Sequence, residues 1–255
     1  MANLSLLRRA SSGALLLVLI VVWEIFSRYV LPTYDSSAQL LLPPPSQGVR
    51  DAFNLMQQGV LWQHVAASAR RVFIGFGVAA VVAIPLGIMM ALSSTLLRQL
   101  NPLVGVLRPI PPIAWIPITL LWFGVTDAQQ YFIIFIGTVF PMLLNTIAGV
   151  QSIEPVIQRA ALSLGAGPRD LFALTLRAAL PNIFVGVRTS LALGWFIIIA
   201  SEMVSASTGL GFLIIESRTA MITERLYVGM FAIGMIGFLQ DQLLLFLRGR
   251  LIPWA

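Results

Sequence analysis

Long apolar stretches separated by short polar segments constrain this chain more than any other feature. Of its 255 residues, 58% are hydrophobic and only 10% are charged, whereas soluble domains carry about 25% charged residues. A helix needs about 20 apolar residues to cross a bilayer. The sequence therefore predicts an all-α membrane protein of one domain, 1–255, with six transmembrane spans at 13–31, 70–92, 102–124, 131–150, 183–204 and 227–247.

Arginine placement predicts the orientation of these spans. Six spans put both termini on one side of the membrane, together with the polar segment 151–181. Positive charge favours the cytoplasmic side. The side with 151–181 would carry eight arginines, namely Arg8, Arg9, Arg98, Arg159, Arg169, Arg177, Arg248 and Arg250, and the other side would carry six. We therefore expect both termini and this segment in the cytoplasm.

The ionisable residues exclude several classes of protein. All sixteen basic residues are arginines, there is no cysteine, and His64 is the one histidine. Without lysine the chain has neither a P-loop nor a Schiff-base mechanism, and without cysteine it has no thiolate site. The net charge of +6 is that of arginines flanking spans rather than of a nucleic-acid binder. We expect no catalytic residues, no nucleic-acid partner and no cofactor bound by this chain itself.

Prolines interrupt the third span. Four of them fall between Pro109 and Pro117, and a regular helix cannot contain so many. Broken backbone at membrane depth persists only where protein or a water-filled cavity satisfies its polar groups. The span is therefore expected inside the bundle beside a pathway, with Pro111 and Trp115 as candidate pathway or gate residues.

Charged and aromatic side chains within spans supply further candidates, because charge inside a membrane is costly. Arg108 either offers donors to a small anion or extends to the interface and caps carbonyls beside the prolines. Glu202 is a gate, a partner of an arginine or an interface carboxylate. Trp195 lines the pathway or packs within the bundle.

Small residues form a stripe along the second span. Glycine or alanine recurs every four residues, so one helix face is small and lets another helix approach closely: Gly75, Ala79, Ala83, Gly87 and Ala91. Outside the spans, 47–58 is expected to be a short surface helix capped by Ser46, and 205–225 a loop.

Segment 151–181 is expected to hold two short helices. Glu154-Pro155 is typical of a helix start, the stretch 165–168 breaks the helix, and Pro181 precedes the fifth span.

The second of these helices carries an apolar knob, Leu171 and Phe172, flanked by Arg169 and Asp170. Such a knob suits a groove on a soluble partner, and a solvated loop is the alternative.

The same segment resembles the cytoplasmic coupling motif of ABC-importer permeases, Glu-Ala-Ala followed after three residues by Gly and later by Leu-Pro. Ala160, Ala161, Gly165 and Leu180-Pro181 match it. Two positions differ from the motif: Arg159 occupies the position of its leading Glu, and Arg177 occupies the position of its usual earlier Pro. Further stretches are similar to permeases of the taurine, sulfonate and nitrate uptake group: 62–64 with Ser68, 108–117, 121–124, 194–203 and 209–211.

The resemblance implies a type I ABC-importer permease fold in a bacterial cytoplasmic (inner) membrane. It implies a homodimer, two ATP-binding subunits that carry ATP and Mg²⁺, and an outer-face binding protein that delivers a small anionic solute. The residues that would couple to the ATP-binding subunit are Ala160, Ala161, Gly165, Arg169, Asp170, Leu171 and Phe172.

Three other functions remain open from the residues alone. An ion-gradient-driven transporter also uses broken helices, although no second proline-broken span lies in the other half of the chain. A membrane enzyme would need a cluster of nucleophile, acid and base. A structural or assembly protein would transport nothing.

Overall fold

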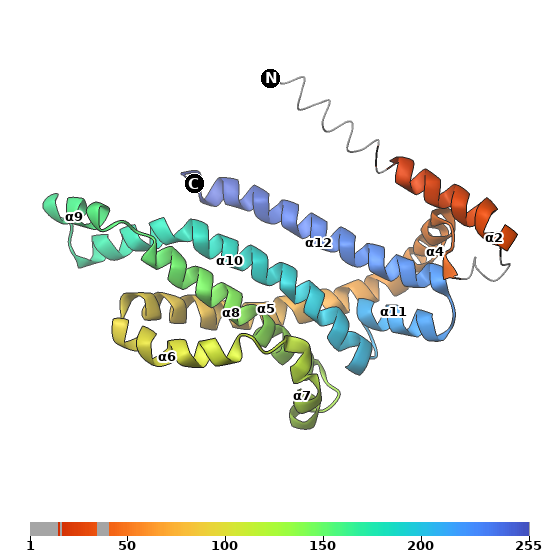
Figure 1. Cartoon of the computed structure of the whole chain (residues 1–255), viewed down its shortest axis with the longest axis horizontal. Coiled ribbons are helices and arrows are strands. Elements are labelled where there is room, and N and C mark those ends of the chain that lie inside the picture. Colours follow the sequence, from red (N-terminus) through yellow and green to blue (C-terminus); the bar gives the residue numbers. More distant parts are fainter. Residues whose placement is uncertain (1–14, 16, 35–40, 255) are drawn as a thin grey trace, which may run out of the picture.

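The computed structural model describes residues 15, 17–34 and 41–254, which form helices and short connections without a β-strand. Four helices there are long and apolar enough to cross a membrane: α5 (Val60–Leu92), α8 (Asp127–Gln151), α10 (Pro168–Ser205) and α12 (Thr223–Leu251). They run roughly along the long axis of the molecule (Figure 1). The predicted all-α, multi-span architecture is thus confirmed in outline, with helices that extend beyond the predicted spans.

Helices α5, α8 and α10 form the core, and glycines bring them together. A Cβ atom on Gly75 would lie 2.8 Å from the carbonyl oxygen of Tyr131, and one on Gly87 would lie 2.8 Å from Thr146 Cβ. The small-residue stripe of α5 is therefore the seam with α8, as the spacing predicted. Gly149 and Gly186 likewise allow α8 and α10 to pack closely against each other.

The third predicted span is a bent pair of helices. α6 (Ser94–Leu107) is followed by a 3-10 turn, η2 (Pro112–Trp115), and α7 (Ile116–Phe123), with a bend of 83° between them. The break falls among the prolines, as predicted, but the helix begins at Ser94 rather than at 102, because Ser93 Oγ caps it by accepting from the Leu96 N–H at 3.3 Å. Counting this pair, the described residues hold five candidate spans.

The predicted first span lies partly outside the described residues, together with Arg8 and Arg9. Its described residues, 15 and 17–31, are helical, and the helix continues to Tyr34; it includes the π-helix η1 (Phe26–Val30) and α2 (Leu31–Tyr34). The surface helix is α4 (Pro45–Gln57), with Pro44 rather than Ser46 at its N-cap. It ends before Gly59, whose φ of 76° suits a residue without a side chain.

The polar segment differs from its prediction in one important respect. α9 (Pro155–Ser163) begins as expected, and the chain turns at Gly165, which has a φ of 85°. From Pro168, however, α10 continues unbroken through Pro181 to Ser205. The expectation of a second short helix in 151–181 is therefore wrong, because a proline removes only one helical hydrogen bond and transmembrane helices tolerate that loss.

The region predicted as a loop contains α11 (Leu210–Thr219), which packs between α10 and α12. α12 itself is peripheral, since its buried residues in the described chain are only Val228 and Gly229. Large apolar side chains such as Phe231 and Phe246 face outward from it. α9 lies at one end of the molecule, and α4 and α11 lie at the other (Figure 1).

Candidate functional site

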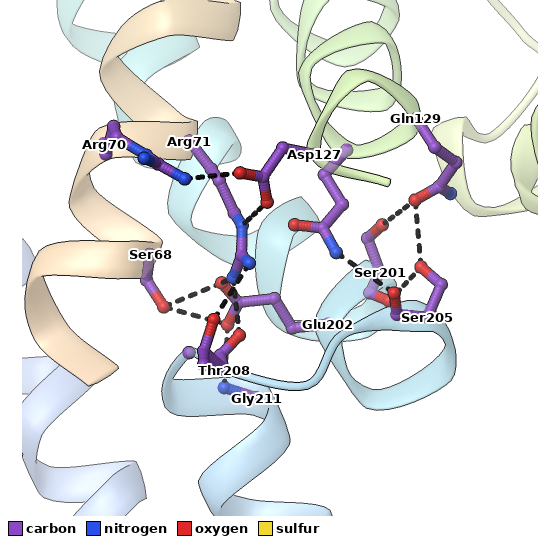
Figure 2. Close-up of polar contacts among 12 residues, drawn as sticks. Ser68, Arg70, Arg71, Asp127, Gln129, Ser201, Glu202, Ser205, Thr208 and Gly211 are labelled. Carbon is purple, nitrogen blue, oxygen red and sulfur yellow. Dashed lines mark hydrogen bonds and ion pairs between the residues drawn. The ribbon is translucent and has the colours of Figure 1, made fainter. Parts of the chain in front are cut away.

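A buried ion pair joins α5 to α10 at the α11 end of the molecule. Arg71 is 4% exposed and Glu202 is 1% exposed, and Arg71 Nη1 lies 2.8 Å from Glu202 Oε1 (Figure 2). Both charges are removed from water, which is favourable only when each is paired and hydrogen-bonded. Glu202, which the sequence suggested as a gate, as a partner of an arginine or as an interface carboxylate, thus has an arginine partner.

Further donors saturate the Glu202 carboxylate. Ser68 Oγ donates to it at 2.8 Å, and the backbone N–H of Gly211 donates at 2.9 Å. Gly211 must be a glycine here, because a Cβ atom would lie 2.8 Å from Glu202 Cβ. The buried carboxylate therefore anchors the first turn of α11 against α5 and α10.

The connection between α10 and α11 is held by the same side chains. Arg71 Nη1 donates to the carbonyl oxygen of Thr208 at 2.5 Å, and the N–H of Gly209 donates to His64 Nδ1 at 3.0 Å. His64 also stacks on Phe212, with ring centroids 6.1 Å apart. The connection is thus fixed to α5 by its backbone.

Asp127 brings α8 into the cluster. Its Oδ1 accepts from Arg71 Nε at 2.8 Å, and its Oδ2 is paired with Arg70 (Figure 2). Two arginines and two carboxylates, contributed by three spans, therefore balance in charge. We call Ser68, Arg70, Arg71, Asp127 and Glu202 the polar cluster.

A neutral group of buried side chains lies next to it. Gln129 Oε1 accepts from Ser205 Oγ at 2.9 Å and from Ser201 Oγ at 3.4 Å (Figure 2), and Gln129 Nε2 donates to Thr119 Oγ1 at 3.3 Å. These contacts tie α7, α8 and α10 together, so the broken span is attached to the core by hydrogen bonds as well as by packing.

The proline break forms one side of a groove of about 660 Å³, which Arg108 and Pro111 line together with residues of α8 and α10 such as Phe140 and Phe196. Arg108 is exposed and has no ion pair within the described residues. Among the described residues, Arg108 is the one charged residue that lines the groove. The geometry thus puts Arg108 and Pro111 together on an open, mostly apolar surface.

The two tryptophan candidates have other surroundings. Trp115 is half-buried, and its Nε1 is buried without a hydrogen-bond partner in the described structure. Trp195 is buried, donates from Nε1 to Gln240 Oε1 at 2.6 Å, and lines a different pocket next to the Arg188–Asp241 pair. Trp195 thus contributes to the contact between α10 and α12, and neither ring is among the residues that line the groove.

The candidate coupling residues lie in an elbow, which we define as residues 155–172. The elbow protrudes beyond the helix bundle at the end opposite α11 (Figure 1). Leu164 is 90% exposed and Phe172 is 48% exposed, while Ala161 and Leu171 are half-buried. The remaining candidates of this group are exposed: Ala160, Gly165, Arg169 and Asp170.

Local hydrogen bonds fix the shape of the elbow. Asp170 Oδ2 accepts from the N–H of Gly167 at 2.9 Å and so caps α10, while Arg159 Nε donates to the carbonyl oxygen of Pro155 at 3.3 Å. The elbow is therefore a stable, partly apolar projection with nothing packed against its tip in the described residues.

The polar cluster was the main feature that sequence reasoning missed. Arg70 and Arg71 are two of the six arginines expected on the other side of the membrane, and no local pattern connects them with Asp127. The available signal was that arginines and carboxylates occur near the ends of three spans on one side, where opposite charges can meet.

Comparison with known proteins places the chain among transport permeases. A family model described as binding-protein-dependent transport system inner membrane component matches residues 83–254. A taurine transport system permease protein of Escherichia coli (strain K12) is 34% identical over 245 residues, which are 94% of this chain and 87% of the relative. A nitrate import permease protein of Leptolyngbya laminosa is 33% identical over 82% of this chain and 78% of its own length.

A bicarbonate transport system permease protein of Synechococcus elongatus is 34% identical over 90% of this chain and 84% of its own length. The predicted resemblance to permeases is thereby confirmed. The chain belongs to the family of inner membrane components of binding-protein-dependent transport systems.

Proposed function

We propose that this chain is the transmembrane subunit of an ATP-driven importer, which passes a small anionic solute from an outer-face binding protein into the cytoplasm by alternating access. One observation carries the proposal: the elbow, with exposed Leu164 and Phe172, projects from a bundle that belongs to this permease family. A chain without lysine has no P-loop of its own. ATP and Mg²⁺ therefore bind to two separate ATP-binding subunits, which receive the elbows.

The continuous α10 supports a lever mechanism. From Pro168 at the elbow to Glu202 in the polar cluster, an α-helix rising 1.5 Å per residue extends about 50 Å. Glycine seams join α10 to α8 and α8 to α5, and the polar cluster ties all three at the far end. A displacement of the elbow by a closing ATP-binding subunit would then move the three helices as one rigid body.

The groove supports the proposal that the solute is an anion. Arg108 offers a planar guanidinium with several donors on a surface that is otherwise apolar. The three relatives above are named for taurine, nitrate and bicarbonate, each of which carries an anionic oxygen group. The path would be completed by a second copy of the chain, in a type I importer fold with six spans and both termini in the cytoplasm of a bacterial inner membrane.

Reconstitution tests the proposal against a gradient-driven transporter. The permease is placed in liposomes with its ATP-binding subunit and binding protein, and uptake of radiolabelled taurine, nitrate and bicarbonate is measured in parallel. We expect uptake that requires hydrolysable ATP and persists when ionophores collapse the proton and sodium gradients. Uptake that continues without ATP and stops with the ionophores would instead establish a secondary transporter.

A further inference from the structure

Three successive backbone N–H groups lead from α10 into α11, and a side chain of another helix accepts from each of them. The N–H of Gly209 donates to His64 Nδ1 at 3.0 Å, that of Leu210 to Ser68 Oγ at 2.8 Å, and that of Gly211 to Glu202 Oε2 at 2.9 Å. His64 and Ser68 lie one turn apart on α5, so they face the same stretch of backbone. The connection, residues 206–211, is thus held to α5 and α10 by its own backbone.

The bond to His64 differs from the other two because the acceptor can take up a proton near neutral pH. A neutral imidazole accepts at one nitrogen, whereas the protonated ring carries a donor on both nitrogens and has no acceptor in any orientation. Gly209 is buried and His64 is only 9% exposed, so little water can replace the lost acceptor. An unsatisfied buried N–H then costs free energy.

Packing fixes the donor and the acceptor in place. The His64 ring stacks on Phe212 with centroids 6.1 Å apart and an interplanar angle of 26°. Gly209 has a φ of 123°, which favours glycine, and a Cβ atom there would lie 2.3 Å from the carboxyl carbon of Glu202. The N–H of Gly209 therefore points at His64 because the surrounding side chains leave the backbone no other course.

Charged groups of several helices share this end of the molecule. They include Glu216 on α11, Glu202 on α10, Arg70 and Arg71 on α5, Asp127 on α8, and Asp51 on α4 with its partner Arg225 on α12. Glu216 acts on His64 through its charge. His64 is the one histidine of the chain, and there is no cysteine. It is therefore the side chain whose ordinary pKa lies within the range of pH 5 to 8.

We propose that His64 is an acid-sensitive latch: its neutral ring holds the connection on α5, and a proton taken from water onto Nδ1 releases the N–H of Gly209. Once the connection is open, His64 is a free ring with an ordinary pKa of about 6.5. At about one pH unit below that value, proton uptake favours the open form about ten-fold, and well above it the latch is intact. In the orientation of the proposed function, on which this consequence rests, the latch responds to the pH of the outer solution.

Amide hydrogen exchange tests the latch, because exchange reports local opening. The full-length permease is placed in lipid nanodiscs, and the protection of segment 206–213 is compared at about pH 7.5 and about pH 5.5, on either side of the ordinary histidine pKa, after correction for intrinsic exchange rates. We expect protection of this segment to fall about ten-fold at the lower pH. Segment 142–150, which has no ionisable residue, is the internal control and should keep its protection.

Two variants separate the acceptor from the ring. His64→Asn keeps an acceptor near the place of Nδ1 and does not titrate, so its protection should be the same at both pH values. His64→Phe keeps a ring against Phe212 without an acceptor, and its protection should be about three- to ten-fold below wild type at the higher pH, as for one lost hydrogen bond. Gln63→Asn is the matched control, since Gln63 is the exposed neighbour of His64, and it should keep the acid response of the wild type.

Two results would overturn the proposal. One is equal protection of segment 206–213 in the wild type at the two pH values. The other is an acid response in His64→Asn as large as that of the wild type, because a carboxylate such as Glu202 or Glu216 would then be the group that takes up the proton. Both comparisons concern the fold of this chain alone, so their outcome is separate from the ATP dependence of uptake measured in liposomes.

Discussion

Removing Arg71 should destabilise the permease far more than removing an exposed arginine. Glu202 is only 1% exposed, and Arg71→Met removes its 2.8 Å partner and one donor each from Asp127 and the carbonyl of Thr208. Breaking a buried ion pair from one side costs about 3–5 kcal/mol, because the remaining charge is left uncompensated. At about 2–4 °C per kcal/mol for a chain of this size, the midpoint of thermal unfolding should fall by about 6–20 °C.

The measurement is thermal unfolding of the purified permease in detergent, with Arg50→Met as the matched control. Arg50 is exposed and makes no ion pair within the described residues, so its loss should cost about 0.5 kcal/mol or less. The double variant Arg71→Met with Glu202→Gln should recover much of the loss, because the buried negative charge is then gone. Equal midpoints for the Arg71 and Arg50 variants would refute the reasoning. So would a double variant whose loss of stability equals the sum of the losses in the two single variants.

Three further predictions concern the elbow, the groove and a close contact. Phe172→Asp, which adds a charge to the exposed knob, should abolish co-purification of the ATP-binding subunit while the permease still folds; an intact, active complex would contradict docking through the elbow. Arg108→Ala should lower uptake at least ten-fold and leave that complex assembled, and normal uptake would remove Arg108 from the path. Gly211→Ala would place a Cβ 2.5 Å from the carbonyl oxygen of Ile199 and should cost about 1–3 kcal/mol, whereas Gly234→Ala, with open space around it, should be nearly neutral in the same unfolding assay.

The features that could be predicted are those set by neighbours in sequence. Prolines at 109, 111, 112 and 117 interrupt a helix wherever it packs, and the chain does bend there. A stripe of small residues marks a close helix contact whatever the partner, and Gly75 and Gly87 do meet a helix. The helix end expected at Pro181 is wrong because it rested on local preference alone. Proline tends to end a helix, but packing of α10 along α8 keeps this helix intact.

The features that escaped prediction depend on residues far apart in sequence. Arg71 and Glu202 are separated by 131 positions, and no local pattern states that the fourth turn of α5 and the last turn of α10 lie at the same depth. Trp195 was a candidate for the pathway because of its type, but its contact with Gln240 follows from how α10 is rotated about its axis.

The sequence by itself determined that the chain is a helical membrane protein, where its third span breaks and which segment leaves the bundle, since hydropathy, proline and glycine act through the local backbone. It also supported the permease resemblance. Only the tertiary structure decided that α10 runs from the elbow to Glu202 without interruption and that four charges from three spans meet there. A charge buried in a low-dielectric interior is stable only when it is paired with an opposite charge. Which charges can pair depends on the relative depth and rotation of the helices, and these are set by packing.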